Sequence, residues 1–290
     1  MNNGNYIKKI RTNKGFTQTY VAKNILSQAS YSKFESGHSD INSYSFVQLL
    51  NKLDMTLEEA VYINNNYKYD KTQELVNRFF ALPYNDVSSL RNLLSDIQIH
   101  LQINKNILLI DITLICKALI TLRTKRDIGQ ARKIVEPVWK RLSKSNQWYL
   151  VDIRVINTIL YLFPNDIALE VTENVLSKLD LYKGFQDTIR LSITFRVNLS
   201  LLLIKEKDYS KALQVLTKTL EDYKKAMPYQ SLAICLGRIA ICKKKLGKVD
   251  ALYSMKQAEQ VLIIYEEMDL WKNIIEEYRY YTDDLPTIDT

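Results

Sequence analysis

The stretch TQTYVAKNILSQASYSKFESG, residues 17–37, decides the fold of the amino-terminal part of the chain. Thr17 and Ser27 each stand directly before a short run of helical periodicity, where a hydroxyl side chain caps a helix well. Gly37 follows the second run, and glycine ends helices readily because it adopts positive φ. The stretch therefore predicts two short helices joined by a tight turn, which is a helix-turn-helix.

Helical periodicity continues on both sides of this stretch. A short amphipathic helix around Tyr6–Ile10 is expected before it, and two further helices are expected after it, over residues 44–53 and 57–63. Residues 1–66 are therefore predicted to form a five-helix domain.

The side chains of the two short helices divide by their helical period. Tyr20 and Val21 are expected to face the core from the first helix, and Tyr31 and Phe34 from the second. The outward face of the second helix should then carry polar and small residues only: Gln28, Ala29, Ser32 and Lys33.

This outward face suits the major groove of DNA. A glutamine amide can hold adenine, an alanine can contact the methyl group of thymine, and a lysine can reach guanine or a phosphate. A small helical packet can also serve only as a protein-binding module. The absence of an apolar patch on this predicted face favours DNA.

Basic residues are expected on the outer side of the first helix: Lys8, Lys9, Arg11 and Lys14. They are either solvated or placed against DNA phosphates, and both interpretations stay open, with Arg11 included among the candidate DNA-binding residues. The formal net charge of +8 and the isoelectric point near 9.1 favour an anionic partner, of which nucleic acid is one.

The composition indicates a nearly all-helical protein in a reducing compartment. Only 7 glycines and 5 prolines occur in 290 residues, too few for the many turns of an all-β protein. Cys116, Cys235 and Cys242 lie in apolar helical stretches without a CxxC spacing, so we expect buried thiols.

Nothing in the sequence predicts a membrane segment. The start MNNGNYIKK has no apolar run of the kind found in a signal peptide. Residues 107–122 are the most apolar run, but Asp111 and Lys117 interrupt it and it is too short to cross a bilayer. We therefore expect a cytoplasmic protein.

The second part of the chain is a series of helix pairs. The polar run NNNYKYD, residues 64–70, interrupts the periodicity and marks a boundary between domains at 1–66 and 67–290. Four segments beyond it align, beginning at Asp127, Asp166, Asp208 and Gly247. Their fifth residues, Ala131, Glu170, Ala212 and Ala251, are separated by 39, 42 and 39 residues.

This spacing predicts a right-handed superhelix of the tetratricopeptide type, with an earlier helix pair at residues 71–80 and 87–102. Glu170 departs from the small residue of the other units, so its unit is expected to pack loosely or to lie at a bend. Pro137 predicts a kink or an early end of its helix. The carboxy-terminal helix, residues 265–281, could either cap the superhelix or pair two chains.

The first helices of successive pairs line the concave side of such a superhelix, which can bind an extended peptide. Polar residues on two of these helices are candidate peptide-binding residues: Arg154, Asn157 and Tyr161 on one, and Arg190, Thr194 and Asn198 on the next. An asparagine amide can both donate to and accept from a peptide backbone, and arginine can pair with a carboxylate. Each of these residues could instead be solvated or hold two helices together.

The amino-terminal domain resembles the Xre/Cro family of phage-repressor-like domains. The resemblance depends on R-x-x-K-G-F-T-Q from Arg11, on the small Ala22, and on the F-E-S-G that ends at Gly37. It implies that Gln18 contacts a phosphate, that Ser27 lies at the amino terminus of the reading helix, and that the outward face of that helix enters the major groove. The turn AKNILS lacks the glycine common in this family, so a different local backbone geometry is expected.

The whole chain resembles the Rgg family of quorum-sensing transcriptional regulators of Gram-positive bacteria. The motifs N-T-I-L-Y-L-F from Asn157 and V-N-L-S-L-L-L from Val197 support this resemblance, together with the domain order. It implies a homodimer that binds double-stranded promoter DNA and responds to a short hydrophobic signalling peptide in the concave groove. Activator or repressor action, the operator and the peptide are not implied.

Two other classes of function are compatible with a helical protein of this kind. A DNA-tethered scaffold that binds a protein partner, without a small peptide, is the alternative. An enzyme has little support, because only two histidines, His38 and His100, occur and no phosphate-binding loop or nucleophile–base pattern is present. We therefore expect no catalytic residues, metal site or cofactor.

Overall fold

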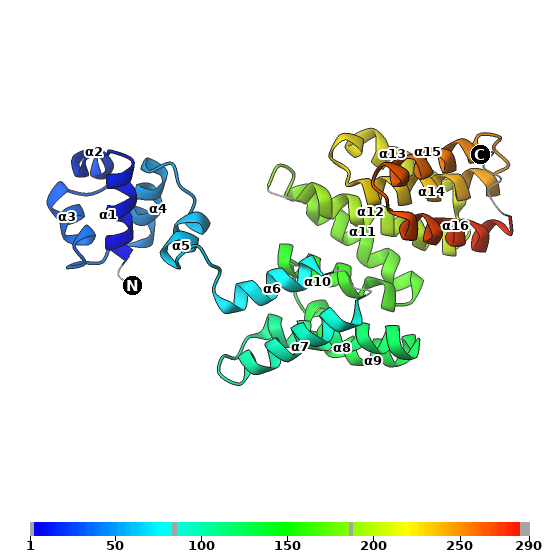
Figure 1. Cartoon of the computed structure of the whole chain (residues 1–290), viewed down its shortest axis with the longest axis horizontal. Coiled ribbons are helices and arrows are strands. Elements are labelled where there is room, and N and C mark those ends of the chain that lie inside the picture. Colours follow the sequence, from blue (N-terminus) through cyan, green and yellow to red (C-terminus); the bar gives the residue numbers. More distant parts are fainter. Residues whose placement is uncertain (1–2, 83–85, 186–187, 285–290) are drawn as a thin grey trace. The chain divides into compact units, whose positions relative to one another are not determined.

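The structure of the chain, a computed structural model, describes residues 3–82, 86–185 and 188–284. Over these residues it is helical throughout and contains no β-strand (Figure 1). The predicted all-α class is confirmed. The helices are α1 (Asn3–Asn13), α2 (Gln18–Ala22), α3 (Gln28–Glu35), α4 (Ser43–Lys52), α5 (Leu57–Asn64), α6 (Lys71–Ala81), α7 (Val87–Leu101), α8 (Ile107–Lys125), α9 (Ile128–Ser143), α10 (Leu150–Ile159), α11 (Asn165–Leu181), α12 (Thr188–Lys205), α13 (Tyr209–Tyr223), α14 (Tyr229–Lys245), α15 (Ala251–Ile264) and α16 (Met268–Thr282), with 3-10 turns η1 (Leu160–Leu162) and η2 (Lys224–Ala226).

Contacts divide the chain into two compact units, residues 1–110 and 111–290. In the first unit, helices α1–α5 have a hydrophobic core of their own, formed by buried residues between Ile7 and Ala60. Helices α6 and α7 also belong to this unit and form a pair joined by the ion pair of Arg78 with Asp96, at 2.7 Å. The functional boundary at residue 66 stays a prediction.

The helix-turn-helix forms as its caps predict. The side chains of Thr17 and Ser27 accept hydrogen bonds from the backbone N–H groups of Tyr20 and Ser30, each at 3.1 Å. Gly37 follows α3 with φ of +79°, the left-handed conformation that suits glycine.

The core positions of the two short helices were predicted correctly except at Tyr20. Val21, Tyr31 and Phe34 are buried, whereas Tyr20 is 49% exposed. Its ring lies on the surface, 4.9 Å from the ring of Phe16 and 5.9 Å from the ammonium group of Lys52. In a helix of only five residues, Val21 and Ala22 supply the buried side, and Tyr20 is left on the flank.

The turn between α2 and α3 does without glycine because Asn24 adopts φ of +66°. Asparagine tolerates this left-handed conformation better than most residues because its short polar side chain can bond locally. A non-glycine residue with positive φ therefore makes this turn.

The second unit contains the predicted helix pairs in sequence: α8 with α9, α10 with α11, α12 with α13 and α14 with α15, followed by α16. The interpretation of Glu170 as the deviating small position is wrong, because Glu170 is exposed and Ala168 is fully buried. The N-cap position of α11 is Pro164, which lies two residues before Asp166, where the alignment began this unit. The fourth residue after the N-cap is small and buried in the second helix of each of these pairs. These residues are Ala131, Ala168, Ala212 and Ser254.

Pro137 does not end its helix. Helix α9 continues through it to Ser143, so the expectation of an early end is wrong. Proline removes one backbone donor, and a helix of 16 residues retains enough other hydrogen bonds and buried side chains to continue. Val135 and Val138 on either side of it are fully buried.

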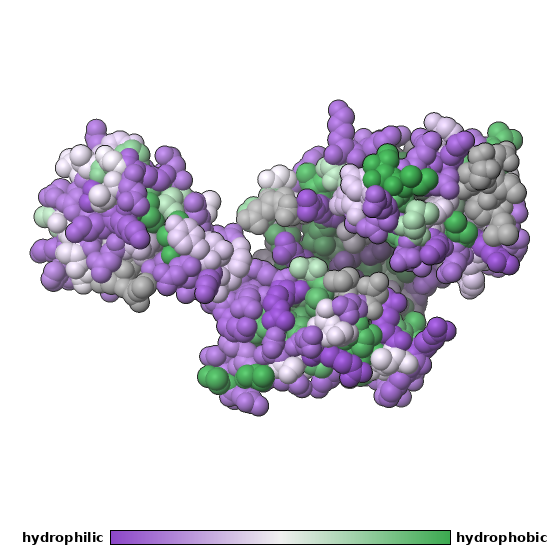
Figure 2. Space-filling model, in the orientation of Figure 1, coloured by the Kyte–Doolittle hydropathy of each residue, from purple (hydrophilic) through white to green (hydrophobic). Residues whose placement is uncertain are grey.

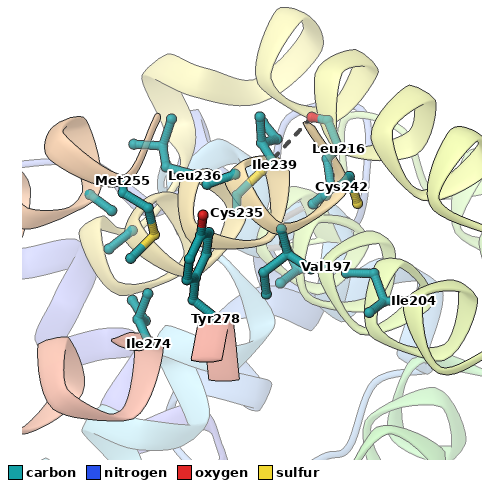
Figure 3. Packing of buried hydrophobic residues seen from close by; sticks show 14 of the residues in the cluster. Val197, Ile204, Leu216, Cys235, Leu236, Ile239, Cys242, Met255, Ile274 and Tyr278 are labelled. Carbon is teal, nitrogen blue, oxygen red and sulfur yellow. Dashed lines mark hydrogen bonds between the residues drawn. The ribbon is translucent and has the colours of Figure 1, made fainter. Parts of the chain in front are cut away.

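One hydrophobic core of the second unit runs from α12 to α16 (Figure 3). Figure 3 shows Val197, Leu216, Cys235, Met255 and Tyr278 converging from different helices, with the Cys235 Sγ 3.8 Å from the carbonyl oxygen of Leu216.

All three cysteines are buried thiols, as predicted, and burial raises the pKa of each to about 12. They therefore stay protonated and unreactive at neutral pH. Within the described ranges, no helix is long and apolar enough to cross a membrane.

Candidate functional site

The outward face of α3 lies as predicted. Gln28, Ala29 and Lys33 are exposed and Ser32 is partly exposed, while Tyr31 and Phe34 anchor the opposite side of the helix in the core. Most of the surface that Figure 2 shows over the five amino-terminal helices is hydrophilic. The side chain of Ser27 is occupied at the helix cap, where it accepts from the Ser30 amide and donates to the Ser30 hydroxyl.

Arg11 does not face outward, so that expectation is wrong. Its side chain is 12% exposed and forms a two-pronged ion pair with Glu35, with Nε–Oε1 and Nη2–Oε2 distances of 2.6 and 2.9 Å. Its remaining Nη1 donates to the carbonyl oxygen of Phe16 at 2.6 Å. The reason is the carboxylate of Glu35, which is 1% exposed and needs a cation beside it.

Gln18 connects this ion pair to the outward face of α3. Its Nε2 donates to Glu35 Oε2 at 2.7 Å, and its Oε1 accepts from Gln28 Nε2 at 2.8 Å. An ionised carboxylate can only accept, so Gln18 must present its nitrogen to Glu35 and its oxygen to Gln28. Gln28 is thus held in one orientation with its Oε1 and one N–H still available, the pair needed to hold an adenine.

The charge state of Glu35 supports this arrangement. Burial raises the pKa of its carboxyl group, but hydrogen bonds from Arg11 and Gln18 lower it more, so the net pKa lies below the ordinary value. Glu35 is therefore ionised at neutral pH, and the order of donors and acceptors from Arg11 to Gln28 is maintained.

In the second unit, the first helices of successive pairs lie side by side. Asn198 Nδ2 of α12 donates to Asn157 Oδ1 of α10 at 3.2 Å, and Arg238 Nη1 of α14 donates to the Val197 carbonyl of α12 at 2.6 Å. Arg238 Nε also donates to Glu277 Oε1 of α16 at 2.7 Å. We call α10, α12 and α14, together with α16, which follows the last pair, the first-helix row.

A small open pocket of about 90 Å³ lies in this row where α10 meets α12. It brings together three of the predicted residues, Asn157, Tyr161 and Asn198. The remaining lining consists of Leu160, Leu201, Leu202 and Lys205. The pocket therefore combines an apolar surface with two amides, a phenol and a cation.

The other predicted peptide-binding residues lie on the same helices but do not line this pocket. Arg154 and Arg190 are exposed, on α10 and α12 respectively. Thr194 is partly exposed, and its hydroxyl donates to the carbonyl oxygen of Arg190, one turn earlier in α12, at 2.9 Å. Their part in binding stays a prediction.

Sequence reasoning missed two residues. Glu35 was given no role, because only the fold shows that a carboxylate in α3 pairs with an arginine in α1. Lys205 was also missed, although it follows Asn198 by seven residues and Leu201 by four, the spacing of one helical face. In the part of the chain that the structure describes, no three histidine, cysteine or acidic side chains are placed to hold a metal ion.

A helix-turn-helix joined to stacked helix pairs places the chain in a known class of transcriptional regulators. Residues 7–59 match the helix-turn-helix family, and residues 91–232 match the carboxy-terminal domain of the HTH-type transcriptional regulator Rgg. The chain belongs to the Rgg family of transcriptional regulators, which confirms the resemblance seen in its sequence. No curated protein sequence matches it significantly.

Solved structures share the fold over nearly the whole chain. A predicted transcriptional regulator from Listeria monocytogenes EGD-e has a TM-score of 0.75 at 22% identity, with 97% of this chain and 98% of that chain covered. The pheromone receptor Rgg2 of Streptococcus dysgalactiae gives 0.71 at 18%, covering 96% and 99%. PlcR of Bacillus thuringiensis, in complex with the peptide PapR7 and DNA, gives 0.69 at 15%, covering 94% and 99%.

Proposed function

We propose that this Rgg-family chain is a cytoplasmic, peptide-responsive transcriptional regulator. It binds promoter DNA as a homodimer through residues 1–66 and holds a short hydrophobic peptide at the first-helix row. The solved complexes of PlcR with PapR7 and DNA, and of ComR from S. thermophilus with DNA and its signalling peptide ComS, support the proposal through their shared fold.

The observation that carries the proposal is the meeting of Asn157 and Asn198 beside an open pocket. One N–H of Asn198 is used for the bond to Asn157, which leaves the Asn198 oxygen as an acceptor and the Asn157 amide nitrogen as a donor. A peptide backbone unit offers one N–H and one C=O. The pair can therefore hold an extended backbone whatever its side chains are.

For DNA, we propose Gln28, Ala29, Ser32 and Lys33 as the reading face of α3. Gln18 and the helix start at Ser27 are assigned to the phosphates at its edge. Arg11 is withdrawn from this set, because its three guanidinium nitrogens are occupied by Glu35 and Phe16.

The two activities are coupled through the dimer. Two reading helices must lie about one turn of DNA apart, roughly 34 Å, to dock together. A peptide that binds one arrangement of the dimer better than another shifts the population of the competent one, typically by 1 to 3 kcal/mol.

The test uses the full chain. An operator is selected from randomised DNA, binding of candidate short hydrophobic peptides is measured by calorimetry, and operator affinity is titrated with and without each bound peptide. We expect a change in operator affinity of about 5- to 150-fold, with scrambled peptides as the control. Equal operator affinity and equal transcription with a tightly bound peptide would overturn the proposal and favour the scaffold alternative.

A further inference from the structure

Lys205, at the carboxyl end of α12, brings an uncompensated positive charge to the pocket that also holds Asn157 and Asn198. No ion pair involves its ammonium group among the residues that the structure describes. The adjacent carboxylate, Glu206, is occupied elsewhere, since its Oε1 accepts from Asn165 Nδ2 at 2.7 Å.

The phenol that lines this pocket is also influenced by a cation from another helix. Burial raises the pKa of the Tyr161 hydroxyl to about 12, and the positive charge of nearby Arg123, on α8, partly opposes that rise. None of the residues that line the pocket is acidic. A lysine beside amides and leucines, without a carboxylate among the lining residues, makes a site that attracts an anion.

The size of the pocket limits what can enter it. Pockets that enclose a whole small molecule measure about 300–1,000 Å³, several times the 90 Å³ found between α10 and α12. This space accepts a single aliphatic side chain, which the three leucines Leu160, Leu201 and Leu202 would surround. The remainder of a ligand must lie outside, along the amides and the cation.

We propose that Lys205 selects a peptide carboxylate next to an aliphatic side chain that fills the pocket. The inference depends on the proposed peptide-binding function and adds the chemistry of the ligand to it. The carboxylate belongs either to the free carboxyl terminus of the peptide or to an aspartate or glutamate within it. The ammonium group recognises both in the same way, as a point charge with three donors.

The experiment uses the full chain and pooled synthetic octapeptides of Leu, Ile, Val and Phe. One pool ends in a free carboxylate, a second in a carboxamide, a third in a carboxamide with one internal Asp, and a fourth in a carboxamide with one internal Asn. Thermal shift identifies the pools that bind, and calorimetry gives their affinities. We expect the first or third pool to bind about tenfold more tightly than its neutral counterpart, which identifies the source of the carboxylate.

Three lysine variants accompany the pools. Lys205→Met should abolish the preference for a carboxylate, so that each anionic pool binds no more tightly than its neutral counterpart, and Lys205→Arg should retain the preference. Lys256→Met, at an exposed lysine of α15, is the matched control and should behave as the wild type.

The outcomes separate this inference from the proposed function. Binding of neutral and anionic pools with equal affinity overturns the role of Lys205 and leaves peptide binding intact. A carboxylate preference that persists in Lys205→Met does the same. If no pool binds, the proposed function and this inference both fail.

Discussion

The two candidate sites of this regulator are built on opposite principles. In the helix-turn-helix, Arg11, Glu35, Gln18 and Gln28 form a continuous series of hydrogen bonds between 2.6 and 2.9 Å that begins at a buried ion pair. At the pocket in the first-helix row, Asn157 and Asn198 share one bond of 3.2 Å.

This difference follows from the ligand that each site is proposed to bind. DNA presents base edges at fixed positions, so a reading side chain gains from being held in place before binding. A peptide arrives flexible and brings its own backbone donors and acceptors, so polar groups in its site must keep hydrogen-bonding capacity in reserve. Substitutions should therefore cost stability in the first site and ligand affinity in the second.

The largest effect is expected for Glu35→Gln, which removes the charge at the centre of the helix-turn-helix network. It leaves Arg11 without its anion in a site where the carboxylate was 1% exposed, and breaking a buried pair in this way costs roughly 3–5 kcal/mol. Hydrogen exchange of the amides in residues 7–60 should show the loss as faster opening. Asp40→Asn, at an exposed carboxylate of the same domain, is the control.

The acid response of Glu35 gives a second measurement on the same pair. Because the pKa of Glu35 is lower in the fold than its ordinary value of 4.5, its stabilising contribution is complete above that value. The contribution is lost as the pH falls through the lowered pKa. The wild type should lose protection in this acid range, and an equal loss in Glu35→Gln would contradict the assignment.

An intermediate effect is expected for Gln28→Ala, at the outer end of the network. The fold should be retained, and discrimination at one base pair should fall by about 1–3 kcal/mol while non-specific binding persists. A randomised-site selection measures this preference. Lys33→Ala tests which of its two possible partners the lysine reaches. Loss of a guanine contact changes the preference at one base pair, whereas loss of a phosphate contact weakens all sites alike and lowers the slope of the salt dependence by about one. An unchanged base preference in Gln28→Ala would contradict the assignment of Gln28 to the reading face.

The smallest overall effect is expected for Asn157→Leu, in the first-helix row. Only its bond to Asn198 is lost, so the free energy of unfolding should fall by about 1 kcal/mol, while peptide affinity should fall about tenfold. Urea unfolding and calorimetry measure the two quantities. Asn174→Leu, at an exposed position of α11, is the matched control. A stability loss as large as that of Glu35→Gln would remove the contrast between the two sites.

Much of the fold could be predicted from local signals. Caps at Thr17 and Ser27, the glycine at Gly37 and the helical period of apolar residues define the helices, because these signals act within a few residues of chain. The error at Glu170 shows the limit of that reasoning. The alignment counted from Asp166, but the cap of α11 lies at Pro164, so the small residue of the repeat is Ala168.

The sequence alone determined that the chain is a helix-turn-helix followed by helix pairs, because caps and periodicity are local. It also indicated Gln28 as a candidate DNA-binding residue, and Asn157 and Asn198 as candidate peptide-binding residues. Only the tertiary structure decided that Arg11 turns inward to Glu35, that Asn157 meets Asn198, and that Lys205 shares their pocket. Arg11 and Glu35 are 24 residues apart in the sequence, and Asn157 and Asn198 are 41 residues apart. The geometry of such contacts depends on how whole helices pack.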